Sequence, residues 1–401
     1  MTTTMQRPTT GGTHFSATVA ALDAQSKQIR SLFTAGMTPV AESTRAAGVD
    51  FYGRREWERQ VLEAERFVDQ IISGRRGLHQ FAEAMSTDLF PQLFGDSLDR
   101  QMYGAYTAAP TTWRNYARRA LVNDFREVKR FAMTGVRGLL TRVPELSEHE
   151  RRTTGEAVYT YEVEKYEAGF GLSFEAMVND DLDAFARLPQ DLAQSAIDSE
   201  EYFATALWAG ASGLNTTNFT VDNDNILTGN PALTRASLQA AITKLMKRVD
   251  ERGNPIAVTA VELVVGPGLA LQAQEIINAT EYRVVDGSGN VTIITGNGVA
   301  ANLRVSVNFW LPVVASTANA DTTWAVFANP QSSGRPALEI GFLRGYEQPG
   351  LYEKVPDMRR IGGGEVPWSF NHSQQEKKVQ HIFGGSFVDP RMVIGSNGSA
   401  S

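Results

Sequence analysis

A strand pattern with little apolar surface of its own most constrains the fold of this chain. Tyr159, Tyr161 and Val163 alternate with polar residues, which is the period of a β-strand with one buried face. Residues 124–133 form a weaker strand candidate, and the segment 145–156 between the two is polar throughout. Two strands joined across such a tip make a long β-hairpin, and an isolated two-stranded hairpin is marginal in water. The hairpin therefore needs a surface to lie on, and a neighbouring subunit is the simplest one.

The composition is that of a globular protein and removes several classes of function. Of the 401 residues, 42% are hydrophobic and 21% are charged, so the chain can bury a core. It has no cysteine, which excludes disulfides, thiolate metal sites and cysteine nucleophiles and is expected of folding in a reducing cytoplasm. The formal net charge of −7 argues against a basic nucleic-acid-binding protein. The sequence shows neither the long apolar run of a membrane span nor the apolar segment of a signal peptide.

The N-terminal quarter predicts an arm followed by helices. The first fifty residues are rich in Thr, Ser, Ala and Gly, and we interpret them as an arm that becomes ordered against a partner. A helix follows, because apolar residues recur at intervals of three and four from Trp57 to Ile71. A second helical stretch, residues 78–85, continues towards Pro91. Charged helices of this kind are usually solvated faces rather than binding sites.

The remainder of the chain predicts an α+β body. Residues 180–208 read as a helix, in which Pro189 must start a segment or introduce a kink. A second helix follows the cap residue Thr234 and is closed by Gly253. Its inner face comprises Leu238, Ile242, Leu245 and Val249.

Five further stretches predict strands. They are residues 261–265, 303–309, 322–328, 337–342 and 376–388. The second of them predicts a half-buried strand, since apolar and polar residues alternate along it. The apolar set is Leu303, Val305, Val307 and Phe309, and the polar set is Arg304, Ser306 and Asn308.

An acidic cluster, Asp180, Asp181 and Asp183, is the strongest candidate for chemistry. Carboxylates bind Mg²⁺, but a dedicated site needs more ligands or a phosphate substrate with its own cradle, and the sequence shows neither. The cluster stands where an amphipathic helix begins. There Asn179 or Asp180 can cap the helix, while the other acids complement its dipole. We therefore predict a helix cap at Asn179, Asp180 and Asp181, and no metal, catalytic or cofactor-binding residue.

Two loop patterns also favour a structural role. Residues 221–225 resemble the start of a calcium loop, but Ile226 and Leu227 stand where a ligand and the glycine turn are needed, so we predict a polar surface turn. Residues 266–268 read Gly-Pro-Gly after a strand. The proline removes an N–H that a phosphate cradle would use, and no GxxxxGK[ST] motif is present. We predict a tight turn from strand to helix.

The five histidines do not form a metal-binding pattern. His14, His79, His149, His372 and His381 show no HExxH or comparable ligand spacing. No serine lies in a GxSxG elbow. We expect His381 on a strand beside Val379 and Phe383, either in the core or at the surface.

Several stretches, taken in order, resemble the major capsid proteins of tailed bacteriophages with the Hong Kong 97 fold. The likeness is closest to the branch found in Mu-like prophages and covers about residues 105–395. The segments that carry it are residues 111–131, 139–148, 159–185, 263–277 and 377–391. The most specific single pattern runs through residues 174–182, and the ordered set is more specific than any one of its members.

The resemblance implies a division of the chain into five parts. Residues 1–124 would be an N-terminal arm and helical region, and residues 125–172 an extended loop, the β-hairpin, that reaches over a neighbour. Residues 173–230 would form the peripheral domain with its long spine helix. Residues 231–365 would form the axial domain, and residues 366–401 a return strand and tail. At the hairpin tip, we expect charged contacts across subunits from Glu148, Glu150, Arg151 and Arg152.

The resemblance also implies a structural function without an enzyme activity or a cofactor. The protein would self-assemble into pentamers and hexamers of an icosahedral shell that encloses double-stranded DNA. It would act in the virion after assembly in the host bacterial cytoplasm, with portal, scaffold or protease and decoration proteins as further partners and no membrane. Two alternatives remain at this point: an encapsulin-like nanocompartment shell, and a metal-dependent hydrolase that uses Asp180 and Asp181.

Overall fold

The computed structural model describes a large part of the chain. The described residues are 89–134, 142, 143, 145, 155–173, 182–250, 253–285, 291–295, 303–331, 336–354, 361, 371 and 374–398. Helices and strands are mixed along them, which confirms the predicted α+β class. The predicted N-terminal arm, the predicted helices from Trp57 to residue 85 and residues 146–154 of the predicted hairpin tip lie outside the described residues.

The chain forms two compact units, each built from three separate segments. Unit 1 comprises residues 1–109, 167–196 and 348–380, and unit 2 comprises residues 110–166, 197–347 and 381–401. Three elements contribute residues to both units: β4 (Val163–Ser173), α7 (Leu182–Trp208) and β14 (Gln374–Phe387). The five-part division expected from the sequence stays a prediction.

Unit 1 contains a helix that the sequence did not reveal, α4 (Leu89–Ala108). It packs beside strand β13 (Gly350–Glu353), which pairs antiparallel with the first half of β14. The Asp99 carboxylate accepts a hydrogen bond of 3.1 Å from the backbone N–H of Leu351. Met102 and Tyr106 of this helix are buried. Because Pro91 lies in the first turn, it does not interrupt the helix.

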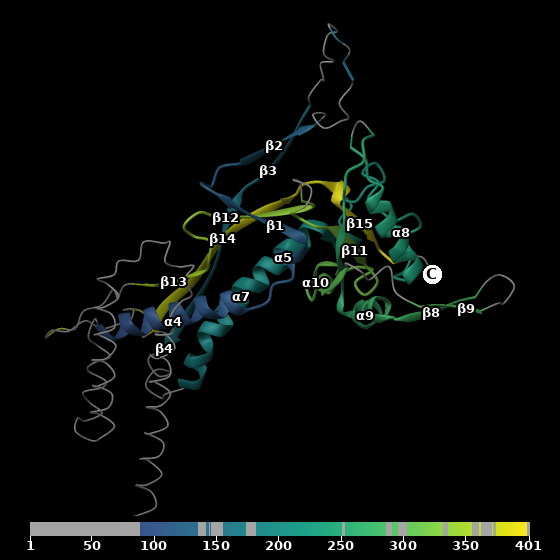
Figure 1. Cartoon of the computed structure of the whole chain (residues 1–401). Coiled ribbons are helices and arrows are strands. Elements are labelled where there is room, and N and C mark those ends of the chain that lie inside the picture. Colours follow the sequence, from purple (N-terminus) through teal and green to yellow (C-terminus); the bar gives the residue numbers. More distant parts are fainter. Residues whose placement is uncertain are drawn as a thin grey trace, which may run out of the picture. The chain divides into compact units, whose positions relative to one another are not determined.

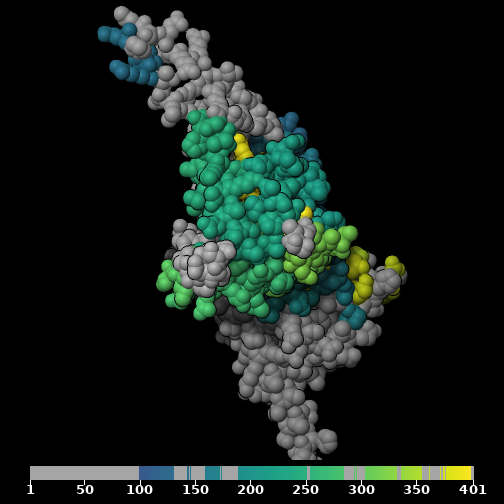
Figure 2. Space-filling view, turned by 90° about the vertical axis from the view of Figure 1, so that its right-hand side faces the viewer, coloured from purple at the N-terminus to yellow at the C-terminus, as the bar shows by residue number. Residues whose placement is uncertain are grey.

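The core of unit 2 is a four-stranded sheet in the order β10-β7-β11-β15. The strands are β7 (Ala260–Val265), β10 (Arg304–Val307), β11 (Trp324–Ala328) and β15 (Val393–Ser396). β10 and β7 are parallel, whereas β7, β11 and β15 run antiparallel in turn. Every residue of β11 and β15 is buried. On the face that Figure 2 shows, yellow C-terminal residues are seen among the teal and green ones only in small gaps, apart from a larger yellow group at the right-hand edge.

Helices and short turns complete this part of unit 2. They are α8 (Arg235–Met246), η2 (Pro267–Leu269), α9 (Ala270–Asn278), α10 (Leu311–Val314), η3 (Pro390–Met392) and the short strand pair β5 (Ala209–Gly210) and β6 (Gly213–Leu214). α8 packs against β7, β11 and β15 (Figure 1). Thr234 caps it in a capping box with Ser237, as predicted for Thr234. The turn at residues 266–268 leads through η2 into α9, which confirms the tight turn predicted there.

A second sheet in unit 2 supports the predicted hairpin. β1 (Ala117–Val122) runs parallel to β12 (Leu338–Leu343), and β12 pairs antiparallel with the second half of β14. The hairpin itself is β2 (Val128–Thr134) paired with β3 (Gly155–Tyr161) from Val128↔Tyr161 to Thr134↔Gly155. In Figure 1 its strands rise away from β1 and β12. A second hairpin, β8 (Glu281–Val285) with β9 (Val291–Thr295), was not predicted.

The predicted limits of one helix and of one strand are wrong. α8 ends at Met246, so Val249 lies beyond the helix and Gly253 instead closes a later turn by donating its N–H to Asp250 O at 3.0 Å. β10 ends at Val307, so Phe309 lies beyond the strand and is 72% exposed. Leu303 is buried and Val305 and Val307 pack against the core, as a half-buried strand requires. The polar residues Ser306 and Asn308 are buried as well. By contrast, α7 ends at Trp208 as predicted and contains Pro189 within its length.

Candidate functional site

One buried carboxylate holds the base of the β2–β3 hairpin. Glu339, on β12, is 0% exposed and accepts hydrogen bonds from β1 and from both hairpin strands. Arg118 of β1 donates through Nε at 3.0 Å, and Arg130 of β2 donates through Nε at 3.1 Å. From β3, the hydroxyls of Tyr161 and Tyr159 donate at 2.9 and 3.3 Å. We call these five residues the Glu339 cluster.

Two arginines and two hydroxyl donors keep the Glu339 carboxylate ionised. Burial on its own raises the pKa of Glu339, but the hydrogen bonds from Arg118 and Tyr161 and the charges of Arg118 and Arg130 outweigh it, so the pKa lies below its ordinary value. Burial and the Glu339 charge raise the pKa of both tyrosines. The carboxylate therefore stays ionised while Tyr159 and Tyr161 keep the protons that they donate.

Glycines let the hairpin base lie close to the sheet. A Cβ added at Gly341 would come within 2.6 Å of the Tyr161 ring. A Cβ at Gly384 would overlap the backbone carbonyl oxygen of Glu162, the single residue between β3 and β4. Only glycine allows backbone and ring to approach β12 and β14 this closely.

A second buried cluster joins α7 to the segment before β1. The Glu200 carboxylate accepts a hydrogen bond of 2.9 Å from the indole N–H of Trp113 and lies 2.7 Å from Nε2 of His381. The adjacent Glu201 accepts from the backbone N–H groups of Thr112 and Trp113, and from the Thr112 hydroxyl at 2.6 Å. Burial raises the pKa of Glu201 although the Thr112 hydrogen bonds oppose the shift. Glu200 and Glu201 thus connect α7 to the segment before β1. His381 lies on β14 in the core, which is one of the two positions expected from the sequence.

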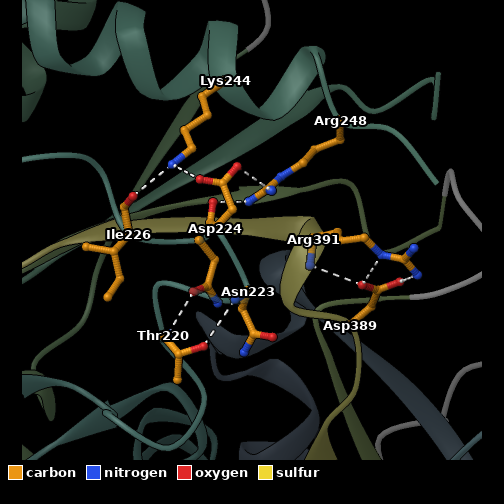
Figure 3. Close-up of polar contacts among 9 residues, drawn as sticks. Thr220, Asn223, Asp224, Ile226, Lys244, Arg248, Asp389 and Arg391 are labelled. Atoms are coloured by element: carbon orange, nitrogen blue, oxygen red, sulfur yellow. Dashed lines mark hydrogen bonds and ion pairs between the residues drawn. The ribbon is translucent and has the colours of Figure 1, made fainter. Parts of the chain in front are cut away.

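The predicted polar turn at residues 221–225 is a turn held by Lys244 of α8 and by Arg248, which follows that helix. Figure 3 shows the Asp224 carboxylate between Lys244, at 2.6 Å, and Arg248, at 3.1 Å. Arg248 also donates to the Asp224 backbone oxygen at 2.6 Å, and Lys244 donates to that of Ile226 at 2.9 Å. Asp224 adopts a positive φ of 50°, which such turns require. Because two cations neutralise it, this aspartate is poorly suited to bind calcium.

The predicted helix cap and the predicted contact residues lie outside the described part of the chain. Asn179, Asp180 and Asp181 immediately precede Leu182, where α7 begins, so their capping role stays a prediction. Glu148, Glu150, Arg151 and Arg152 also lie outside the described residues. In the part that the structure describes, no group of three or more His, Asp or Glu is arranged to hold a metal ion. Of the helices described, none combines the length and hydropathy needed to cross a membrane.

The capping interpretation predicts small effects at the start of α7. Replacing Asp180 or Asp181 with Asn should cost about 0.3–1 kcal/mol, because only a favourable interaction with the helix dipole is lost. Alanine at the true cap residue should cost about 1 kcal/mol. Thermal or denaturant unfolding measures both changes, and calorimetry with Mg²⁺ should show no tight binding. Stoichiometric binding that disappears in the Asp180→Asn, Asp181→Asn double variant would contradict the prediction.

Comparison with known proteins adds the deciding observation. A family model described as "Phage capsid protein" matches residues 156–395, more than half of the chain. The chain belongs to the phage capsid protein family. The match begins within β3 of the hairpin and extends to β15. It therefore includes the cluster residues from β3 onwards, Glu339 among them, but not those between residues 112 and 130. Membership confirms the predicted relation to phage capsid proteins and implies a structural subunit that forms a virion shell with copies of itself.

Solved phage structures resemble this capsid protein at low sequence identity. One from Microbacterium phage Oxtober96 is 7% identical with a TM-score of 0.43, covering 70% of this chain and 85% of the other. One from Mycobacterium phage Che8 is 14% identical with a TM-score of 0.42, covering 73% and 93%. The capsid structure of cyanophage P-SCSP1u is 10% identical with a TM-score of 0.42, covering 71% and 87%. No curated protein sequence matches significantly. The assignment therefore rests on the family match.

Proposed function

We propose that this capsid protein is the major head subunit of a tailed bacteriophage and assembles into the pentamers and hexamers of a closed icosahedral shell. The observation that carries the proposal is the β2–β3 hairpin. Its base is fixed by the Glu339 cluster, while its described strands beyond the base pair only with each other. A two-stranded ribbon is marginal in water by itself, so a surface of a neighbouring subunit is its natural support.

The shell would enclose double-stranded DNA through weak contacts that do not depend on sequence. A net charge of −7 supports this, because a strongly basic lining would hold DNA through counterion release and resist its ejection. Assembly would occur in the host bacterial cytoplasm. Portal, scaffold or protease and decoration proteins would be additional partners.

The family match does not favour the two alternatives drawn from the sequence. An encapsulin-like shell would enclose an enzyme rather than DNA, so the contents of purified particles distinguish it. A hydrolase that uses Asp180 and Asp181 would need a metal and an activity that disappears when both residues are changed to Asn. The calorimetry described above tests the metal.

Sedimentation velocity and electron microscopy of the expressed full chain test the proposal. We expect closed shells with five-fold and six-fold capsomers. Particles from infected cells should contain double-stranded DNA, seen as nuclease-protected DNA after external DNA is removed. A monodisperse monomer in virions or infected-cell lysates would overturn the proposal, and shells that contain protein cargo in place of DNA would favour the encapsulin-like alternative.

The hairpin tip should contribute to assembly rather than to folding. Glu148, Glu150, Arg151 and Arg152 would each contribute about 0–1 kcal/mol as exposed ion pairs across subunits, repeated over the whole shell. Deleting residues 147–153 should leave the unfolding midpoint of the subunit unchanged but raise the concentration needed for assembly, increasingly so at high salt. Light scattering measures the assembly threshold. Shells of undiminished stability from the shortened protein would show that the tip is no clamp.

A further inference from the structure

We infer that Glu339 is a positioning residue for assembly: one buried carboxylate sets the direction in which the β2–β3 hairpin leaves unit 2. The inference rests on the proposed function, in which this hairpin contacts a neighbouring subunit. The contacts of Glu339 do not depend on that function, because all five residues of the Glu339 cluster belong to unit 2 of a single subunit.

The covalent attachment of the hairpin leaves its direction open. Residues 123–127 connect β1 to β2, and Glu162 alone connects β3 to β4. Two short links on the same side of a ribbon act as a pair of hinges about which the ribbon can tilt. The nearest apolar support is a small cluster of Val122, Tyr161, Val163, Leu343 and Ile382, against which Val128 and Tyr159 pack. Apolar contacts are not directional, so they stabilise the base without selecting one tilt angle.

The Glu339 cluster supplies the missing directional contacts. Arg118 lies opposite Glu339 in the β1–β12 register, so it belongs to the supporting sheet. Arg130 and Tyr159 are opposite one another in the β2–β3 register, and both donate to the same carboxylate. Tyr161, two residues further along β3, donates as well. Contacts from both strands and from two levels of one strand fix the tilt, whereas a single contact would act as a pivot.

A carboxylate is the group that this geometry requires. An ionised carboxylate accepts about four hydrogen bonds and donates none, which suits two guanidinium groups and two hydroxyls. Glutamine at position 339 would have nearly the same shape. Its amide nitrogen, however, cannot accept a hydrogen bond and would face arginine or tyrosine groups that also donate. The side chains of Arg118 and Arg130 are 28% and 38% exposed, so they can regain water when the carboxylate is lost. The subunit should therefore fold while the hairpin loosens.

The test compares Glu339→Gln with Glu262→Gln as a matched control. Glu262 is also a buried glutamate of unit 2, but it accepts hydrogen bonds from Ser306 on β10 and from Asn115 on the short helix α5 (Trp113–Tyr116), away from the hairpin. Because the chain has no cysteine, Thr134→Cys and Gln239→Cys give two unique spin-label positions, one on β2 and one on α8. Double electron–electron resonance then measures the distance distribution between hairpin and body. Amide hydrogen exchange on the full-length subunit, kept unassembled at low concentration, provides the second readout.

We expect exchange of the β2 and β3 amides to become about tenfold to hundredfold faster in Glu339→Gln, the range that corresponds to losing charge-assisted hydrogen bonds. The β7 and β11 amides should be unchanged, the label distance distribution should broaden, and the yield of closed shells should fall. Glu262→Gln should leave the hairpin unaffected. Unchanged hairpin exchange in Glu339→Gln, or an equal increase in Glu262→Gln, would overturn the inference. If the wild-type protein forms no shells, the proposed function fails; if both proteins form shells equally well, only the positioning role fails.

Discussion

Gly384→Ala is expected to destabilise unit 2 by about 3 kcal/mol, the upper end of the usual cost of overpacking. The added Cβ would overlap the backbone carbonyl oxygen of Glu162 and crowd the Cα of Val163. These are main-chain atoms between β3 and β4, so no rotamer change can relieve the clash. Either β14 or the hairpin base must move, and with it the contacts of Tyr161 and Val163, which are both buried. The midpoint of urea unfolding, followed by circular dichroism, measures the loss.

Gly104→Ala is the matched control for this prediction. Gly104 lies within α4, and nothing stands within 4 Å of the position that a Cβ would take. Alanine is favoured over glycine in a helix, so this variant should gain up to about 1 kcal/mol. The same substitution should thus have opposite signs at the two sites. A Gly384→Ala protein as stable as the wild type would show that the hairpin base does not lie against β14 as described.

The two adjacent glycines of β14 show what the sequence could and could not predict. Residues 376–388 were predicted as a strand, and β14 confirms it. Within a strand, glycines such as Gly384 and Gly385 can mark a bulge, a bend or a close approach of another backbone, and the sequence alone does not say which. Their role depends on a backbone more than two hundred positions earlier, which comes to lie against Gly384 only in the folded chain. No local pattern carries that information.

β10 shows what hydrophobic alternation leaves out. Leu303 is buried and Val305 and Val307 pack against the core, as expected of a half-buried strand, yet the polar Ser306 and Asn308 are buried as well. Asn308 donates to the Thr205 hydroxyl at 2.7 Å and accepts from the backbone N–H of Leu311, the first residue of α10, at 3.0 Å. Satisfied polar groups can be buried at little cost, and hydrophobic periodicity does not register that.

The Glu339 cluster was beyond sequence reasoning for a similar reason. β12 was predicted from residues 337–342, and Glu339 is the single charged residue in a strand that is otherwise apolar. A charge in such a strand indicates a buried partner. The sequence therefore indicated that Glu339 has a buried partner. It did not indicate which one, because the partners of Glu339 lie on three other strands that come together only in the folded chain. The acidic residues Asp180, Asp181 and Asp183, by contrast, lie close together in sequence, so a local pattern reveals them.

Trp113→Ala is expected to cost about 3–5 kcal/mol, the range for removing a fully buried large aromatic side chain. Trp113 is 0% exposed, and its ring stacks on Phe342 of β12 at a centroid distance of 5.9 Å. Its indole N–H donates to the buried Glu200, so alanine would leave both a cavity and a carboxylate without that donor. Because Glu200 also lies beside His381, the loss would reach α7, β12 and β14 together.

Trp113→Phe separates the two contributions. Phenylalanine fills most of the volume but removes the N–H, so it should cost about 1–3 kcal/mol, the price of leaving a buried acceptor short of one partner. Chemical denaturation followed by far-ultraviolet circular dichroism gives both values, since tryptophan fluorescence changes with the substitution itself. The ordering wild type, Phe, Ala is the expected result. If Trp113→Ala lies within about 1 kcal/mol of the wild type, well below the cavity cost, then the segment before β1 does not anchor this core. If Phe and Ala are equally destabilising, the hydrogen bond to Glu200 rather than the packing on Phe342 holds α7 to β12.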